Sequence, residues 1–193
     1  MEIEVSTEAG EGHSGRNRRT ALIIAVLALC LSISETLGKG AQTEALSANV
    51  EASNLWGFYQ AKTLRQTTLK VASDTLKIQS MSTTAPEARE AIEGQLGKWA
   101  DTIARYESEP ATGEGRKELM ARAKAAEESR DHSLAAYHQF ELASAALQIA
   151  VVLASAQIIT GATFLLWIVG VLGITGIAFC AIGFFAPLAL HLF

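Results

Sequence analysis

The stretch that decides the fold class is LASAALQIAVVLASAQIITGATFLLWIVGVLGITGIAFCAIGFFAPLALHLF, residues 142–193, which contains no Lys, Arg, Asp or Glu. A transmembrane helix needs about 20 consecutive, mostly apolar residues, so this stretch is too long for one span and long enough for two. Its least apolar point is TGAT at residues 160–163. We therefore predict transmembrane helices at residues 142–160 and 164–187.

The composition of the whole chain excludes two broad classes of protein. Of its 193 residues 49% are hydrophobic and 19% are charged, and every charged residue lies before Leu142. A soluble globule does not carry so long an uncharged segment. The net charge of -4 offers no basic surface for a phosphate backbone, so we expect no nucleic-acid partner.

A first, shorter apolar segment follows three arginines near the N-terminus. Residues 20–34 are uncharged, and flanking residues extend them to a marginal span at residues 20–38. A cleaved signal peptide is the alternative, because Arg16, Arg18 and Arg19 resemble its charged region and Ser32-Ile33-Ser34 resembles a cleavage site. We favour a retained span, since a long leader precedes it. Residues 1–19, which carry four glutamates among Gly and Ser, read as a flexible acidic tail.

The arginines also predict the orientation in the membrane. Three of them precede the first span, and only Lys39 follows it closely. The positive-inside rule then places the N-terminus in the cytoplasm. With three spans, a multi-pass protein of the bacterial inner membrane would have residues 39–141 and the C-terminus in the periplasm.

Residues 39–141 have the pattern of an extramembrane helical hairpin. Two apolar stripes at heptad spacing follow one another, with a change of phase near Gly57. The first stripe consists of Ala41, Ala45, Ala48, Ala52, Leu55 and Tyr59, and the second of Ala61, Leu64, Thr68, Val71, Thr75 and Ile78. Together they predict one long helix that ends before Pro86.

The returning leg of the hairpin is predicted in two pieces. Thr84 and Glu87 form a capping-box pattern around Pro86, and a second helix carries the stripe Ile92, Leu96, Trp99, Ile103 and Tyr106. Proline and two glycines predict a kink or loop at residues 108–115. A third helix then starts at Arg116 and keeps one heptad register past Glu141 into the membrane. The chain is thus predicted to be an all-α membrane protein, with three transmembrane helices and a coiled-coil-like hairpin between the first and the second.

The string LWGFYQAKTLRQ at residues 55–66 resembles the bacterial domain-of-unknown-function family 4337. The similarity extends to the arginine-rich stretch at residues 17–20 with its following span, to residues 45–46 and 51–53, and to LQIAVVLAS at residues 147–155. It covers roughly residues 17–187. The resemblance implies a small membrane protein with a helical insertion between its first two spans, and it implies no activity, cofactor or catalytic residue. Many members of that family carry basic residues in the turn between the last two spans, where this chain has TGAT at residues 160–163. This difference removes one support for the orientation.

Two sets of residues are candidates for interaction. The first set lies around the string above and comprises Trp56, Tyr59, Lys62, Arg65 and Gln66. Hairpin or oligomer packing, a partner-protein surface and a small-ligand site are the three alternatives for it. The second set is a small-residue stripe in the last span, where Gly173, Gly176 and Gly183, with Cys180 between them, permit close approach of another helix.

Other polar residues in the chain give weaker signals. His138 and Glu141, with His132 nearby, supply too few ligands to predict a metal site. Gln148 and Gln157 lie on opposite sides of the second span, so we expect interhelical hydrogen bonds rather than a shared pore. Cys30 and Cys180 are not paired by their spacing. We therefore predict no catalytic, cofactor or metal site.

These observations favour a non-enzymatic scaffold or accessory subunit of the inner membrane. It would self-associate, or dock on a membrane complex, through its hairpin and its small-residue face, so the expected partners are membrane lipid, further copies of the chain and other membrane-protein subunits. A homo-oligomeric channel or transporter is one alternative, although the last two spans lack the charged groups that transport typically uses. A periplasmic sensor module is another.

Overall fold

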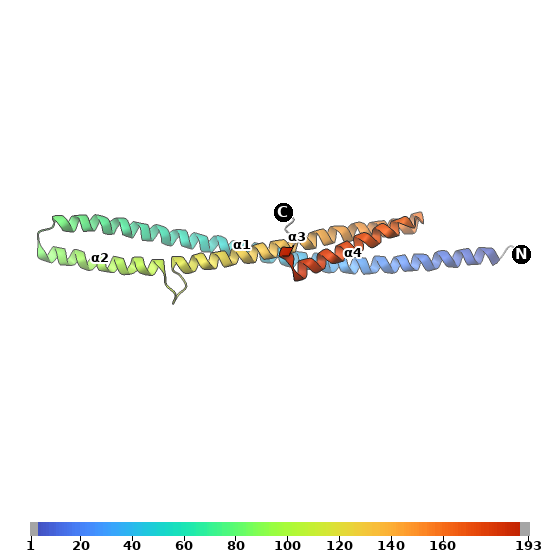
Figure 1. The fold of residues 1–193 in the computed structure, drawn as a ribbon, viewed down its shortest axis with the longest axis horizontal. Helices are drawn as coiled ribbons and strands as arrows, with labels where there is room; N and C mark the ends of the chain where they lie inside the picture. Colours follow the sequence, from blue (N-terminus) through green and yellow to red (C-terminus); the bar gives the residue numbers. More distant parts are fainter. Residues whose placement is uncertain (1–3, 190–193) are drawn as a thin grey trace. The chain divides into compact units, whose positions relative to one another are not determined.

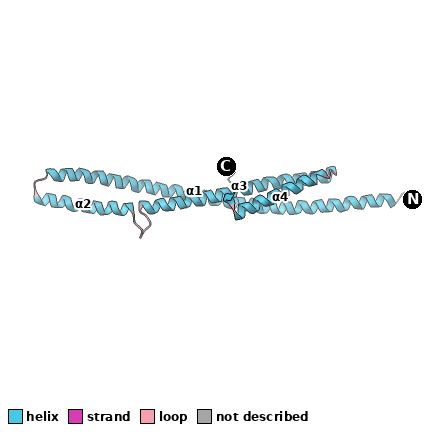
Figure 2. Cartoon of the chain, viewed as in Figure 1, coloured by secondary structure: helices cyan, strands magenta, loops and turns pink. Residues whose placement is uncertain are grey.

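A computed structural model describes residues 4–189, with side chains from residue 18 onward. It contains four α-helices, α1 (Glu4–Ser82), α2 (Pro86–Glu107), α3 (Arg116–Thr160) and α4 (Phe164–Phe185), followed by the short 3-10 turn η1 (Pro187–Ala189) (Figure 1). No strand occurs within residues 4–189, and loops interrupt the helices only briefly (Figure 2). The all-α prediction is confirmed.

The interruptions fall where proline and glycine predicted them. Loops occupy residues 83–85, 108–115 and 161–163, and Gly113 and Gly161 adopt φ angles of 70° and 71°, which side chains disfavour. α3 begins at Arg116 and passes Glu141 without a break, as its heptad register indicated.

Two local details differ from expectation. The backbone of residues 4–19 is helical, whereas the composition suggested a flexible tail; extending an existing helix requires no new nucleation. The predicted capping box is also wrong, because the N-cap of α2 is Ala85 and has no side-chain hydrogen bond. The residue before a proline favours extended backbone, and this preference moves the cap one residue beyond Thr84.

Three of the helices are long and apolar enough to cross a membrane. They are the part Arg18–Ser82 of α1, α3 and α4, which contain segments with mean hydropathy of 2.1, 2.0 and 2.4. α1 and α3 include the predicted spans at residues 20–38 and 142–160, and α4 covers residues 164–185 of the span predicted at 164–187. A membrane location is therefore compatible with length and composition in each case.

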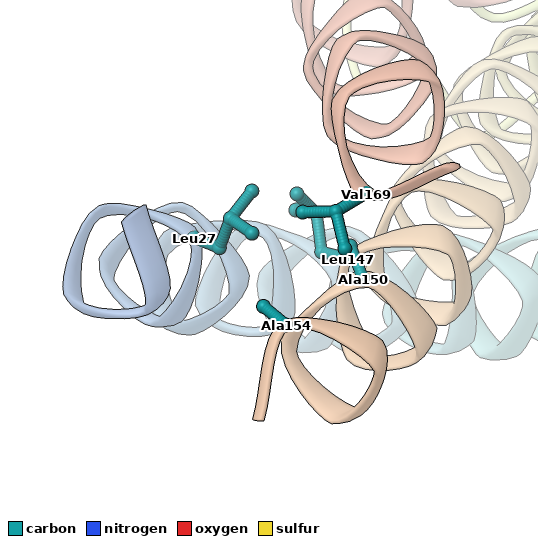
Figure 3. Close-up of a cluster of buried hydrophobic side chains, with 5 residues drawn as sticks. All are labelled: Leu27, Leu147, Ala150, Ala154 and Val169. Carbon is teal, nitrogen blue, oxygen red and sulfur yellow. The ribbon is translucent and has the colours of Figure 1, made fainter. Parts of the chain in front are cut away.

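The chain divides into two compact units, residues 1–45 with 131–193, and residues 46–130. In the first unit, Leu27 of α1 points toward α3 and α4, where it joins a buried apolar cluster (Figure 3). The other members of this cluster are Leu147, Ala150, Ala154 and Val169. The alanines of α3 permit close packing, because small side chains let the helix backbones approach.

Polar side chains link the helices of the first unit. The hydroxyl of Thr20 donates to Gln157 Oε1 at 3.0 Å, and Gln148 Nε2 donates to Glu35 Oε1 at 3.1 Å. Ser34 Oγ donates to the carbonyl oxygen of Phe140 at 3.1 Å. The prediction that both glutamines form interhelical hydrogen bonds is confirmed.

In the second unit, α1 uses one heptad register for packing from end to end. Buried and half-buried positions recur along this register at Ala48, Ala52, Leu55, Tyr59, Lys62, Gln66, Leu69, Ser73, Leu76 and Ser80, with Trp56, Thr63 and Ala72 half-buried beside it. The opposite contacts are antiparallel, since Leu55 packs with Leu119 and Gln66 bonds to Ile103. The predicted stripe of α2 is half-buried at each of its positions, and α3 packs through Leu119, Ala123 and Ala126.

The second predicted stripe of α1 does not pack within the chain. Leu64, Val71 and Ile78 are 69%, 62% and 70% exposed, and Ala61, Thr68 and Thr75 are exposed as well. α1 is one unbroken helix, so the same side of it faces α2 and α3 before and after Gly57. The packed positions that begin with Ala52 and Leu55 therefore continue through Lys62, Gln66 and Ser73. The apolar stripe that follows Gly57 is therefore turned to the outside.

Candidate functional site

Arg116, the first residue of α3, connects all three helices of the hairpin. Its guanidinium donates from Nε to Thr63 Oγ1 at 3.0 Å, from Nη1 to Gln66 Oε1 at 2.6 Å, and from Nη2 to Tyr59 Oη at 3.1 Å. Nη1 also donates to Glu107 Oε2 at 2.9 Å. These five residues, which we call the Arg116 cluster, join α1, α2 and α3. A planar guanidinium with five donors suits such a three-helix junction.

Gln66 is the buried centre of the Arg116 cluster, with only 3% of its surface exposed. Its Nε2 donates to the carbonyl oxygen of Ile103 at 3.2 Å and to Glu107 Oε2 at 3.0 Å. Its Oε1 accepts the bond from Arg116. Both donors and one acceptor site are thus satisfied, so the cost of burying the amide is offset.

Lys62, another residue of the first predicted set, also makes its contacts within the hairpin. Lys62 Nζ lies 3.8 Å from Glu109 and 3.7 Å from Glu114, and 5.3 Å from the centroid of the Tyr106 ring. Lys62 therefore ties α1 to the loop at residues 108–115. An ion pair with one partner near the solvent contributes little on its own, but the lysine connects to the loop twice.

Trp56 packs inside the hairpin. Its ring and that of Tyr59 are in edge contact at a centroid distance of 5.4 Å and an angle of 85°. Trp56 Nε1 donates to Glu127 Oε1 at 2.9 Å. Of the three alternatives for these residues, hairpin packing accounts for Trp56, Tyr59, Lys62 and Gln66.

Arg65 behaves differently from its predicted companions. It is exposed and, together with the exposed Phe58 and Arg122, lines a cavity of about 280 Å³. The remaining lining residues are Leu55, Ala61, Lys62, Glu114 and Leu119. Arg65 is thus the one residue of the first set that faces outward.

The sequence did not reveal Arg116 and Glu107 as partners of Gln66. Residues 50 positions apart, as Gln66 and Arg116 are, have no local pattern that pairs them. One signal was present, because a cation in the first turn of a helix opposes the helix dipole and so requires a compensating partner.

A second polar contact closes the loop at residues 108–115. Glu118 accepts hydrogen bonds from Ser108 Oγ at 2.6 Å and from the backbone N–H of Glu109 at 3.2 Å. Gly115 is buried there, and a Cβ at this position would lie 2.7 Å from Ser108 Cα. Glycine is therefore needed for the close approach of the two backbone segments.

A pH dependence follows from these carboxylates. The hydrogen bond from Gln66, together with the charge of Arg116, lowers the pKa of Glu107, and the hydrogen bond from Ser108 lowers the pKa of Glu118. A lowered folded-state pKa adds stability above the ordinary value of 4.5, and this stability is lost as the pH falls through the folded-state value. We expect the melting temperature measured by circular dichroism to fall below pH 4.5. The double variant Glu107→Gln/Glu118→Gln should show a smaller fall, and an equal fall in both proteins would contradict the assignment.

Ser73 is a buried polar residue without compensation. Its hydroxyl has no hydrogen-bond partner, and it lines a cavity of about 310 Å³ beside Leu96 and Ile103. We expect Ser73→Ala to raise the free energy of unfolding of the hairpin by about 1 kcal/mol, because it removes an unpaired buried hydroxyl. Native-state hydrogen exchange can measure this, with the exposed Thr67→Ala as the control. A loss of stability in Ser73→Ala would show that the hydroxyl has a partner.

The model of a family described as a domain of unknown function, DUF4337, matches residues 16–186. The chain belongs to this family. The match covers nearly the same residues as the predicted resemblance, from the arginine-rich stretch to the end of the last span. No curated protein and no solved structure matches the chain.

In this DUF4337 chain the glycine stripe of α4 packs against the chain itself. A Cβ on Gly173 would lie 3.0 Å from Leu27 Cδ2, and one on Gly176 would lie 2.7 Å from Leu147 Cγ. Gly183 is in similar contact with Gln139 and Phe140. Side chains of α1 and α3 of the same chain therefore lie against these glycines, and a role of the stripe in contacts between molecules stays a prediction.

The histidine and carboxylate near the second span of this DUF4337 chain form a pair. His138 Nδ1 lies 3.7 Å from Glu141 Oε2. Within residues 18–189, no group of three or more His, Cys, Asp or Glu side chains converges. Two ligands are fewer than a structural metal site uses.

Proposed function

We propose that the protein is a non-enzymatic scaffold or accessory subunit of the bacterial inner membrane. Its N-terminus would lie in the cytoplasm, and its hairpin and C-terminus in the periplasm. The hairpin would make protein contacts, either with further copies of the chain or with the subunits of a membrane complex.

One observation supports this proposal: the polar side chains of the hairpin bind its own helices, and apolar side chains remain on its surface. The charged and hydrogen-bonding side chains of the hairpin hold its own helices to one another. They are Arg116, Gln66, Lys62 and Tyr59. What remains exposed includes large apolar side chains, namely Phe58, Leu64, Val71 and Ile78. Exposed apolar surface in a contiguous stripe marks contact with another molecule.

Purification from the native membrane in a mild detergent tests the proposed function. Native mass and composition should be read together, with a chain mass of 20.6 kDa. We expect either a whole multiple of this mass or a stoichiometric complex with another membrane protein. A monomer without any associated subunit would contradict the proposal.

Reporter fusions test the proposed orientation separately. A fusion within the loop at Gly113 and one at the C-terminus should both report a periplasmic location. Cytoplasmic signals from both would reverse the orientation, because the two sites are on the same side of a chain with three spans.

A further inference from the structure

The exposed stripe of α1 has the geometry of a two-stranded coiled-coil seam. Its spacings alternate between 3 and 4 residues, with Ala61, Thr68 and Thr75 at the a positions and Leu64, Val71 and Ile78 at the d positions. A repeat of 3.5 residues keeps such a stripe facing a second helix, and only a helix with the same repeat interlocks with it. The packed face of α1 is on the opposite side, so the seam is free to accept that helix.

The hydroxyl groups of the two threonines in the seam already have hydrogen-bond acceptors within α1. Thr68 Oγ1 donates to the carbonyl oxygen of Leu64 at 2.9 Å, and Thr75 Oγ1 donates to that of Val71 at 3.0 Å. Each hydroxyl donor is therefore satisfied within α1. A partner helix would cover these positions without leaving an unpaired donor, which is the usual cost of a polar group in an interface.

The residues that flank the seam are compatible with a second copy in parallel. In a parallel pair, each g position faces the e position five residues further along the other helix. The resulting pairs are Gln60 with Arg65, Thr67 with Ala72, and Asp74 with Gln79. No pair brings like charges together, and two of the three pairs match an amide with a charged group. Copies inserted in one membrane with the same topology also run α1 in the same direction.

We propose that the seam of Ala61, Leu64, Thr68, Val71, Thr75 and Ile78 binds the same seam of a second copy, in parallel and in register. This inference rests on the proposed function, for which it names the partner. Identical residues then meet at every layer, so Leu64, Val71 and Ile78 each contact their counterpart. Arg65, the outward-facing member of the predicted interaction set, lies at the edge of this interface.

Cysteine cross-linking of the full chain in native membranes tests the proposal. In a background with Cys30→Ser and Cys180→Ser, we expect Val71→Cys and Ile78→Cys to form disulfide-linked dimers on mild oxidation. Lys70→Cys, which is exposed but off the seam, is the matched control and should give several-fold less dimer. Dimers of equal yield from all three positions would indicate random collision and overturn the pairing.

A charge substitution gives a second, independent measurement. Val71 is exposed in the single chain, so Val71→Asp leaves the hairpin intact while placing two carboxylates against each other in the seam. We expect the native mass in mild detergent to fall to half, with Lys70→Asp as the control that keeps the wild-type mass. An unchanged mass for Val71→Asp would overturn the seam as the interface.

The failure of this inference is distinguishable from failure of the proposed function. If Val71→Cys forms no dimer while the wild-type chain still co-purifies with another complex, the pairing is wrong and the scaffold role stands. If the wild-type chain is a monomer with no associated subunit, both are wrong.

Discussion

Replacement of Arg116 by alanine should open the hairpin at the junction of α1, α2 and α3. The variant loses four hydrogen bonds and leaves Gln66 Oε1 and Glu107 without their shared donor. Because the guanidinium is mostly buried and Glu107 is partly exposed, we expect a loss of about 2 to 3 kcal/mol in the opening free energy. Hydrogen exchange of the amides around Gln66 and Ile103 in the detergent-solubilised chain would measure it.

Two further variants make this experiment specific. Arg116→Lys retains the charge but not the planar fork, so it should recover only part of the loss. Arg122→Ala removes an exposed arginine from the same helix and should change the opening free energy by no more than about 0.5 kcal/mol. If Arg116→Ala and Arg122→Ala behaved alike, the Arg116 cluster would have no role in holding the hairpin.

The second large effect is expected at Gly176 in α4. An added Cβ would lie 2.7 Å from Leu147 Cγ and 3.1 Å from the carbonyl oxygen of Ala143, and Leu147 is fully buried. We expect Gly176→Ala to destabilise the first unit by about 1 to 3 kcal/mol, because an overpacked core must shift side chains or backbone. Gly176→Leu should prevent the native packing of α4 altogether.

Thermal stability of the purified chain measures this effect. The temperature at which the monodisperse peak is lost in size-exclusion chromatography should fall for Gly176→Ala. Gly170 supplies the matched control in the same helix, since a Cβ there has no neighbour within 4 Å, and alanine is the better helix former. If both variants lost stability equally, the close contact with Leu147 would not explain the glycine.

The features that could be predicted from sequence are those with local causes. Pro86, Pro110 and Gly161 act on the backbone beside them, so the loops between helices were located correctly. The charge-free length predicted two helices, and α3 and α4 are both long and apolar enough to cross a membrane. The heptad register of α3 passes unbroken through the charge boundary at Glu141. Each of these signals is contained within one or two turns of helix.

Features that depend on a distant partner could not be predicted. The second stripe of α1 is the more apolar face after Gly57, yet Gln66 and Ser73 pack instead, because the helix is continuous and its face was set earlier. The glycines of α4 indicated that another helix packs closely against them, but their spacing does not say whether that helix belongs to the same chain or to another molecule. The partners of Arg116 come from two other helices, and no spacing rule connects them.

The polar residues in the packed face of α1 have a consequence for how the hairpin folds. A heptad pattern matches itself after a slip of seven residues, so alanine and leucine alone would tolerate several alignments of the two legs. Gln66 finds Ile103, Glu107 and Arg116 in one alignment only, and a slip would bring Ser73 or Tyr59 to its place. A buried polar residue at such a position fixes the alignment of paired helices. The Arg116 cluster therefore selects one register of the two legs in a hairpin whose repetitive apolar pattern would permit several.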